Sequence, residues 1–387
     1  MTTALSGVRV LDFGHHRAGP HCALILARLG AEVIKIEECG GEQLRKHGIH
    51  WAQENNTKKS LTLDLRRPEA LQVAYDLVAI SDILVQNFRP GVMEKLGLGY
   101  KKLAEINPKI IVVNISAYGD DNANRLKPGF DGLMQSLSGL MLLNGEEQMS
   151  PVKTHPPIVD RVAGLQAAVG ALAALYERQR SGKGQTLDLA LLSSAYSIAD
   201  AELASTLVEK KSPIRRGNRA GGPPVNNAYR TADGWVYIAT GGRERLWQKV
   251  CEVIGKQEWL TDPQLSTKAG RTERADEIDL AVQSHIDGKH TNNVVEEFSK
   301  FGVPIAPVRT PLEAAQDTYP FDRKAIVWIE TNGERIPVTG DMWHFSRSEV
   351  AVGELPEAGE HVDSVLKDTL GYSLKKIEKL WRSGIFG

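Results

Sequence analysis

The first half of the chain alternates short apolar runs with helical patterns, and this alternation is the strongest constraint on its fold. The apolar runs expected to form strands occupy residues 8–13, 33–37, 60–65, 83–86 and 110–115. Strands separated by helices pair in parallel, because the connecting helix carries the chain back to the edge where the next strand starts. The pattern therefore predicts a parallel, doubly wound α/β sheet.

The middle of the chain carries the clearest helical pattern. Residues 160–179 form a run rich in Ala and Gly, which favours a helix packed closely on its neighbours. A strand at 186–191 and one long helix at 193–209 are expected next. The most apolar stretch, 162–176, is too short to span a bilayer, so we expect no membrane partner.

The second half indicates a separate, smaller domain. Residues 210–227 are polar and rich in Gly and Pro, which is typical of a linker. A hairpin around residues 232–234 and several helices follow. From residue 316 the pattern changes again, with short strands at 326–330 and 334–338 and a helix at 374–383. We therefore expect a large domain over 1–209, a linker over 210–227, a small α+β domain over 228–315 and a final segment over 316–387.

The composition excludes several kinds of partner. Lys and Arg number 47 against 48 Asp and Glu, so the molecule as a whole does not attract nucleic acid. Three cysteines without metal-ligand spacing fit a reduced protein rather than a disulfide scaffold. The first residues lack the basic and apolar regions of a signal peptide. We therefore expect a cytoplasmic protein with no nucleic-acid partner.

Two loops are candidates for binding an anion. Residues 14–20 (GHHRAGP) lie between a strand and a helix and offer Arg17 with two histidines. Residues 87–91 (NFRPG) follow another strand and offer Arg89, with Lys95 nearby. The chain has no G-x-G-x-x-G or G-x-x-x-x-G-K-[ST] motif, which disfavours dinucleotide and nucleotide cradles. A solvated basic loop and a helix-initiating turn remain the alternatives for the two segments.

Asp160 is the third candidate, because it stands where the helix of residues 160–179 begins. One interpretation is an N-cap, which is the usual role of Asp at a helix start. The other is a carboxylate nucleophile held beside helix amides in an apolar wall. The residues alone leave both interpretations open. The scattered histidines, among them His47 and His50 with Gly48 between them, predict no metal site.

Long blocks of the chain, in order, resemble the class III CoA-transferases of the CaiB/BaiF type, the family of formyl-CoA transferase and carnitine CoA-transferase. The blocks are LSGVRVLDF followed by AGP, LGAEVIKIE, KKSLTLDL, NFRPGVMEKLGLGY, NPKIIVVNISAYG, PGFDGLMQSLSGL, VDRVAGLQAAVGALAALYERQRSGKGQ, and RRGNR with YRTADGWVYIA. They cover nearly the full length.

The resemblance implies roles for particular residues. Asp160 opens the D-x-x-x-G motif that ends at Gly164, and it is implied to form a covalent aspartyl-CoA thioester. From position alone, and not from the resemblance, we expect backbone amides at the start of the helix after Asp160 to stabilise oxyanions. The residues implied to hold CoA are His16, Arg17, Ala18, Asn87, Arg89 and Lys95, with Leu63 near the adenine. Those implied to line the substrate site are Tyr118, Gly221 and Gly222.

The resemblance also implies the architecture and the substrates. The fold would be a Rossmann-like sheet in a large discontinuous domain, completed by the return segment 316–387, plus the smaller α+β domain. Two such chains would form an interlocked-ring homodimer. CoA would pass from an acyl-CoA to a free carboxylic acid, without a tightly bound cofactor. The cations that could serve a dicarboxylate acceptor are Arg17, Arg45, Lys46, Arg125 and Arg161.

Three other functions compete with this one. A 2-methylacyl-CoA racemase or epimerase shares the fold, but the position of one of its acid/base histidines holds Phe130, which cannot transfer a proton. A dinucleotide-dependent dehydrogenase is disfavoured by the missing glycine motifs. A non-catalytic CoA-binding scaffold is disfavoured by the presence of Asp160.

Overall fold

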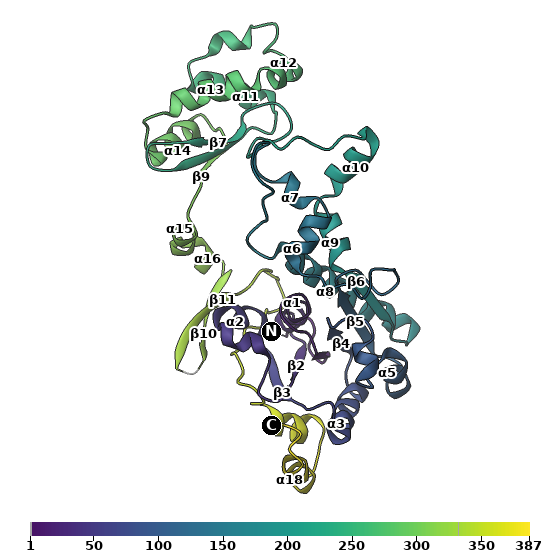
Figure 1. Ribbon diagram of the computed structural model, residues 1–387. Coiled ribbons are helices and arrows are strands. Elements are labelled where there is room, and N and C mark those ends of the chain that lie inside the picture. Colours follow the sequence, from purple (N-terminus) through teal and green to yellow (C-terminus); the bar gives the residue numbers. More distant parts are fainter. Residues whose placement is uncertain (1, 332) are drawn as a thin grey trace. The chain divides into compact units, whose positions relative to one another are not determined.

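The computed structural model describes residues 2–331 and 333–387, and the chain divides into two compact units (Figure 1). The first unit holds the residues up to 141 together with 153–210 and 319–387. The second holds residues 142–152 and 211–318. The first unit is therefore discontinuous, because the last segment of the chain returns to it.

A six-stranded sheet forms the centre of the first unit. Its strand order is β3-β2-β1-β4-β5-β6, and every neighbouring pair is parallel. The strands are β1 (Arg9–Asp12), β2 (Glu32–Glu37), β3 (Lys59–Thr62), β4 (Ile83–Gln86), β5 (Ile111–Ser116) and β6 (Thr186–Ala190). The predicted doubly wound parallel sheet is confirmed. Its order reverses between β1 and β4, and the loops after these two strands diverge there and leave room for a ligand.

Helices and the returning C-terminus cover the sheet. The helices of this unit along the chain are α1 (Ala18–Arg28), η1 (Gln43–His47), α2 (Ile49–Asn55), α3 (Pro68–Ala79), α4 (Val92–Lys95), α5 (Tyr100–Ile106), α6 (Asp131–Leu137), α8 (Ile158–Ser181), α9 (Leu191–Ile198) and α10 (Asp200–Glu209). The short helix α7 (Leu140–Leu143) lies at the boundary with the second unit. The return segment adds α16 (Tyr319–Asp322), the hairpin β10 (Ile326–Thr331) and β11 (Glu334–Thr339), then α17 (Val362–Ser364), η3 (Val365–Thr369) and α18 (Leu374–Arg382).

The two faces of the sheet are covered by different elements. Leu11, Ile34, Leu61 and Leu84 belong to a buried cluster that also contains the apolar side chains of α3 and of the C-terminal segment. The C-terminus is tied to β3, since Thr62 Oγ1 donates to the carbonyl of Phe386 at 2.7 Å. Helices α1 and α8 contact the sheet as well, α1 at β1, β2 and β4 and α8 at β5 and β6.

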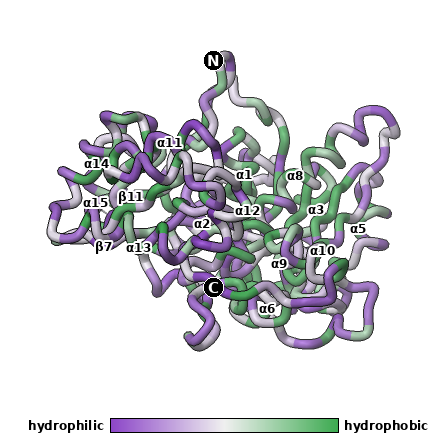
Figure 2. The backbone as a smooth tube through the Cα atoms, turned by 90° about the horizontal axis from the view of Figure 1, so that it is seen from above, coloured by the Kyte–Doolittle hydropathy of each residue, from purple (hydrophilic) through white to green (hydrophobic). Residues whose placement is uncertain are grey.

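Helices α1 and α8 pack on each other with very little space between their backbones. A Cβ atom at Gly164 of α8 would lie 2.9 Å from the carbonyl oxygen of Ala18 and from Cβ of His21 on α1. Both helices carry long hydrophobic stretches in Figure 2. At 24 residues, α8 exceeds the predicted run and is as long and apolar as a membrane span. Its packing against α1, α9, β5 and β6 is that of a core helix.

Two predicted helices differ from the structure. The helix expected over 193–209 is broken at Ala199, whose φ of −106° and ψ of 26° leave the helical range. Ser197 Oγ bonds to the carbonyl of Ser194, and the Asp200 carboxylate accepts the N–H of Ala201, so side chains compete with the helical ladder there. Helix α1 begins at Ala18, three residues earlier than expected, since Pro20 is tolerated in a first turn.

The second unit is an α+β structure with its own core. Strands β7 (Asn226–Arg230), β8 (Trp235–Ala239) and β9 (Ile305–Pro307) form an antiparallel sheet, and β7 with β8 is the predicted hairpin. Its helices are α11 (Glu244–Val253), η2 (Gln257–Leu260), α12 (Lys268–Glu273), α13 (Ala275–Ile286), α14 (Thr291–Lys300) and α15 (Pro311–Gln316). Trp247 and Trp259 stack at its centre, 5.8 Å between ring centroids.

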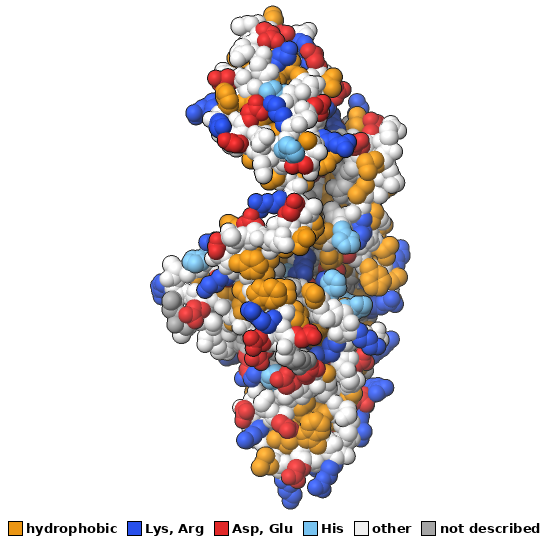
Figure 3. Space-filling view, turned by 90° about the vertical axis from the view of Figure 1, so that its left-hand side faces the viewer, with side chains coloured by type: hydrophobic (Ala, Val, Ile, Leu, Met, Phe, Trp, Pro, Cys, Tyr) orange, Lys and Arg blue, Asp and Glu red, His pale blue; other side chains and the backbone are white. Residues whose placement is uncertain are grey.

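Charges of both signs are intermixed on one face of the molecule. On the face drawn in Figure 3, Lys and Arg side chains alternate with Asp and Glu, and this face shows no extended patch of one sign. The arrangement agrees with the nearly balanced composition.

A fully buried ion pair joins three elements beneath the C-terminal edge of the sheet. Lys58 Nζ lies 2.7 Å from Asp12 Oδ2 at the end of β1, and both side chains are 0% exposed. The same ammonium donates to the carbonyl of Pro20 on α1 at 2.9 Å and to Asn55 Oδ1 on α2 at 3.0 Å. Every proton of the ammonium group therefore has an acceptor, which is the condition under which a buried charge is tolerated.

We predict that Lys58→Met lowers the free energy of unfolding by about 3 kcal/mol, because the buried Asp12 carboxylate loses its hydrogen-bonded cation and keeps only Lys35, at 3.9 Å, as a charged partner. Urea denaturation followed by circular dichroism measures the change. The matched control is Lys59→Met, whose ammonium pairs with Glu32 at 2.6 Å but is 37% exposed. The control should cost less than about 1 kcal/mol. Equal effects of the two substitutions would contradict the prediction.

Candidate active site

A cavity of about 370 Å³ opens at the C-terminal edge of the sheet, between the loops that follow β1, β4 and β5. The loop after β1 contributes residues 15–18, the loop after β4 contributes 87–90, and the end of β5 contributes 115–117. Asp160 of α8 and Phe130, directly before α6, complete the wall. The cavity therefore lies where the reversal in strand order separates neighbouring loops.

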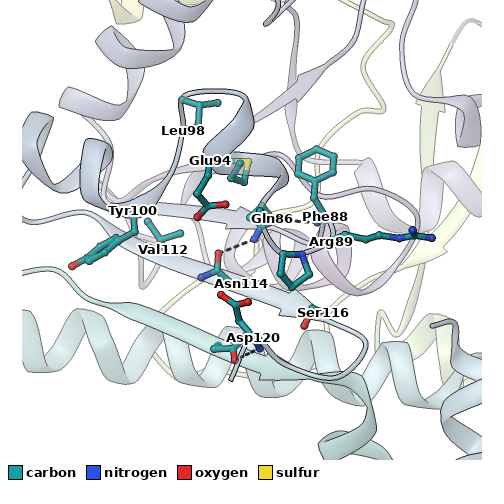
Figure 4. Close-up of a pocket in the computed structure, with 14 residues that line it drawn as sticks. Gln86, Phe88, Arg89, Glu94, Leu98, Tyr100, Val112, Asn114, Ser116 and Asp120 are labelled. Carbon is teal, nitrogen blue, oxygen red and sulfur yellow. Dashed lines mark hydrogen bonds between the residues drawn. The ribbon is translucent and has the colours of Figure 1, made fainter. Parts of the chain in front are cut away.

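Most of the residues predicted from the sequence meet in this cavity. Those lining it are His16, Arg17, Ala18, Asn87, Arg89 and Asp160. A smaller neighbouring pocket of about 50 Å³ shares Phe88, Arg89 and Ser116 with it. In Figure 4 the Arg89 side chain extends away from the polar residues Gln86 and Asn114 of that pocket.

Five predicted residues lie elsewhere. Leu63 is buried in the core beside the sheet, Lys95 is on α4, and Tyr118 is half-buried after β5. None of the three lines the cavity. Gly221 and Gly222 belong to the second unit. The roles of these residues in holding CoA or substrate stay predictions.

The loop before α1 is held by side chains from three other positions. The N–H of His15 donates to Asn87 Oδ1 at 2.7 Å, and Asn87 Nδ2 donates back to the carbonyl of His15 at 2.8 Å. The N–H of His16, whose φ is 59°, donates to Glu42 Oε1, and Lys35 Nζ donates to the carbonyl of Gly14. Because its backbone groups are bonded in this way, the loop presents Arg17 from a rigid support.

Asp160 reaches the cavity because Gly164 lets α8 approach α1. The two residues are four apart and lie on one face of the helix. A side chain at position 164 would clash with Ala18 and His21, as described above, and would push α8 away from the loop that carries Arg17. In the D-x-x-x-G motif, the glycine thus permits the close contact between α8 and α1, and this contact places the carboxylate of the aspartate in the cavity.

Asp160 does not cap its helix. Helix α8 starts two residues earlier, at Ile158, with Pro157 at the N-cap position and no side-chain cap there. Asp131 of α6 takes that role, since its Oδ2 accepts the N–H groups of Val159 at 2.8 Å and Asp160 at 3.2 Å. The capping interpretation of Asp160 is therefore wrong, and its carboxylate is free for another role.

The amides expected to stabilise an oxyanion are already engaged. Those of Val159 and Asp160 bond to Asp131, and that of Arg161 donates to the carbonyl of Pro157 at 3.1 Å. The positive end of α1 is the alternative, because its first residue, Ala18, lines the cavity.

The surroundings of Asp160 disfavour its ionised form. Burial, then the negative charge of Asp131, raises the pKa of Asp160 from 3.8 to about 7, and Glu54 acts in the same direction. The positive charges of Arg17 and Arg161 oppose this shift. A carboxyl group that titrates near neutral pH is typical of a reactive position.

The structure separates the five cations that the sequence grouped as an acceptor site. Arg17 and Arg125 line the cavity. Arg45 is paired with Glu37 at 2.6 Å, Arg161 is paired with Glu54 at 2.9 Å, and neither lines the cavity. Lys46 lies on η1, also outside the lining. The cavity instead gains Lys127, which the sequence did not single out.

Sequence reasoning missed Asp131, Glu54 and His21. Asp131 acts 28 and 29 positions along the chain from the amides it accepts, and Glu54 is 33 positions from His21. Asp131 lies within the block PGFDGLMQSLSGL, which was the one signal that could have drawn attention to it.

Comparisons with known proteins show the family of the chain. Residues 5–362 match the family model described as CoA-transferase family III. The chain belongs to this family. A formyl-CoA:oxalate CoA-transferase of Bradyrhizobium diazoefficiens is 31% identical over 99% of this chain and 97% of its own length. A succinyl-CoA–D-citramalate CoA-transferase of Chloroflexus aurantiacus is 31% identical over 84% of this chain and 83% of its own. The protein is thus a class III CoA-transferase.

Solved structures share the fold of this CoA-transferase. A CaiB/BaiF family protein from Brucella suis superposes with a TM-score of 0.86 at 27% identity, over 96% of this chain and all of that one. Rv3272 from Mycobacterium tuberculosis gives a TM-score of 0.84 at 28% identity, over 94% of this chain and 98% of that one. The resemblance inferred from the sequence blocks is confirmed.

We predict that the Asp160 carboxyl of the free enzyme titrates near pH 7, so that it is protonated below about pH 6 and ionised above about pH 8. Infrared difference spectra between acid and neutral solutions should show one protonated carboxyl band that is absent from Asp160→Asn. Asp64, whose pKa is lowered by its bond to Arg66, provides the control Asp64→Asn, which should retain the band. An Asp160 carboxyl already ionised at pH 5 would contradict the prediction.

Proposed function

We propose that this CoA-transferase moves CoA from an acyl-CoA donor to a free carboxylic acid through a covalent aspartyl-CoA thioester on Asp160. One observation carries the proposal. The carboxyl group of Asp160 does not cap its helix, is largely buried, and lies in a cavity built by the two loops that resemble CoA-binding segments. A free carboxylate acceptor is a poor electrophile, and activation through an enzyme carboxylate gives each step an activated partner.

The reaction is written in four balanced steps. The Asp160 carboxylate attacks the donor thioester carbonyl and forms a mixed anhydride, while CoA leaves as thiolate. The thiolate attacks the Asp160 carbonyl, which gives the aspartyl-CoA thioester and releases the donor acid. The acceptor carboxylate then attacks the carbonyl of this thioester, which forms a second mixed anhydride, between Asp160 and the acceptor, and releases the CoA thiolate. Finally the thiolate attacks the acceptor acyl carbonyl, and Asp160 returns as a carboxylate.

The cavity supports this chemistry on two sides. The apolar side chains of Phe130, Ile115 and Leu191 provide a wall for an acyl group and limit water near intermediates that hydrolyse. The cationic side chains of Arg17, Arg89 and Lys127 line the same cavity, where they can bind the phosphates of CoA or the carboxylate of an acceptor. The start of α1 adds a helix dipole that favours negative charge in the same space.

Phe130 also supports transfer rather than racemisation. It lines the cavity and is 66% exposed, and the resemblance places an acid/base histidine of the racemases at this position, where Phe130 has no proton to give. Proton abstraction on one side of a carbon and delivery on the other needs two such groups. The acyl-CoA racemase alternative therefore lacks a partner at this position.

The assembly and location of the enzyme remain proposals. We propose an interlocked homodimer. Apolar side chains are exposed along one face of α8, and burial against a partner subunit would remove them from water; they are Leu165, Val169 and Tyr176. We also propose a cytoplasmic location, supported by the free cysteines Cys22, Cys39 and Cys251.

We predict that Asp160 becomes modified when the enzyme is mixed with acyl-CoA and quenched with hydroxylamine or borohydride. Peptide mapping by mass spectrometry should place the label on Asp160. Asp160→Ala should lose both labelling and turnover, by about 10⁴-fold or more, since a nucleophile has no substitute. An Asp160→Ala enzyme that retained substantial transfer would end the proposal. Circular dichroism verifies that the variant is folded.

We predict that Arg89→Ala raises the Michaelis constant for acyl-CoA about tenfold and changes kcat less than about twofold, because the contact to phosphate is the same in the ground and transition states. Added salt should raise the Michaelis constant of the wild type more than that of the variant. The control is Arg382→Ala on α18, whose guanidinium is 83% exposed at the side chain. A fall in kcat alone would assign Arg89 another role.

A further inference from the structure

The Glu54 carboxylate lies at the centre of a group of cations behind the active site. Its side chain is 0% exposed, and it projects from α2. His21 Nδ1 of α1 lies 3.1 Å from Oε2, and the Arg161 guanidinium of α8 lies 2.9 Å from Oε1. Arg17, in the loop before α1, lies 3.5 Å from the same oxygen. One buried acid thus lies against two arginines and an imidazole that come from three separate elements.

The Asp160 carboxylate has no such partner. Within residues 2–331 and 333–387, its oxygens form no hydrogen bond or ion pair, although Arg161 is its neighbour in sequence. Arg161 directs NH2 to Glu54 and NH1 to His21 Nδ1 at 3.1 Å. Arg17 directs NH1 to Glu54 and NH2 to His50 Nδ1 at 3.3 Å. Both arginines beside the nucleophile are therefore bonded elsewhere.

We propose that Glu54 is a positioning residue that holds Arg161 and Arg17 away from Asp160, so that the nucleophilic carboxylate stays unpaired. The inference rests on the proposed attack by Asp160. An arginine that binds a carboxylate through two hydrogen bonds stabilises the anion and fixes its lone pairs, which weakens it as a nucleophile. Glu54 prevents that pairing by being the better-buried acceptor.

The charges around both carboxylates determine the expected pH dependence. The groups that act on Glu54 are His21, Arg161, Lys58 and, at 3.5 Å, Arg17. Those that act on Asp160 are Asp131, Arg17, Glu54 and Arg161. Loss of the Glu54 charge removes a group that raises the pKa of Asp160 and frees two that lower it. All of these changes move the pKa of Asp160 down, so a larger fraction is ionised at a given acidic pH.

The test is single-turnover acylation of Asp160 in Glu54→Gln, followed by rapid quenching and mass spectrometry across pH. Gln keeps the size of the side chain and removes its charge. The rate at about pH 8 should fall roughly tenfold while the midpoint of the pH profile moves lower by about half a unit or more. The dissociation constant of acyl-CoA is measured in the same variant, so that a change in binding through Arg17 is separated from the change in the rate of attack. If a larger fraction of Asp160 is ionised and yet Asp160 attacks acyl-CoA more slowly, its carboxylate is paired with an arginine.

A second substitution that restores acylation distinguishes a positioning role of Glu54 from a merely structural one. The double variant Glu54→Gln with Arg161→Gln has no freed arginine at position 161, and its acylation rate should return to within about threefold of the wild type. The control is Asp82→Asn, which breaks an ion pair of 2.7 Å with Arg178 at the other end of α8. Acylation in this control should stay within about twofold of the wild type.

Three results would overturn the inference. They are a wild-type rate with an unshifted profile in Glu54→Gln, a loss that Arg161→Gln does not restore, and an equal loss in Asp82→Asn. If Glu54→Gln does not fold, Glu54→Asp replaces it, since the shorter side chain draws back from Arg161, and the same loss and rescue are expected. Absence of label on Asp160 in the wild type would instead refute the proposed function.

Discussion

The close approach of α8 to α1 is the contact on which the active site depends. Gly164 leaves no side chain between the helices, and a Cβ there would lie 2.9 Å from Ala18 and His21. Because Asp160 lies one turn before Gly164, the same contact brings its carboxylate to the start of α1. Burial of that helix pair against the sheet then fixes the distance between the carboxyl and the loop that carries Arg17. The absence of a side chain at Gly164 therefore allows both the contact between the two helices and the placement of the Asp160 carboxyl.

The active site destabilises the ionised form of Asp160. A shift of its pKa from 3.8 to about 7 corresponds to roughly 4 kcal/mol against ionisation. Burial is the largest cause of the shift, and the negative charge of Asp131 adds to it while Asp131 also caps the start of α8. The arrangement is consistent with a group that must be reactive rather than merely stable.

Much of the fold could be predicted from local patterns. Residues 83–86 were expected as a strand and form β4 with the same bounds, and the two strands of the β10–β11 hairpin were placed within one residue. The errors occurred where side chains compete with the backbone. Ser197 and Asp200 divide one expected helix into α9 and α10, and the first turn of α1 was taken for a loop because it contains Pro20.

The sequence by itself determined the alternation of strands and helices, the D-x-x-x-G spacing and the family, because these depend on periodicity and on contiguous blocks. Only the tertiary structure decided which carboxylate caps α8 and which arginines face the cavity. Asp131 caps a helix from 28 positions away, and Glu54 binds Arg161 across more than a hundred. Such contacts follow from the way the helices pack on the sheet, and no local pattern of residues encodes them.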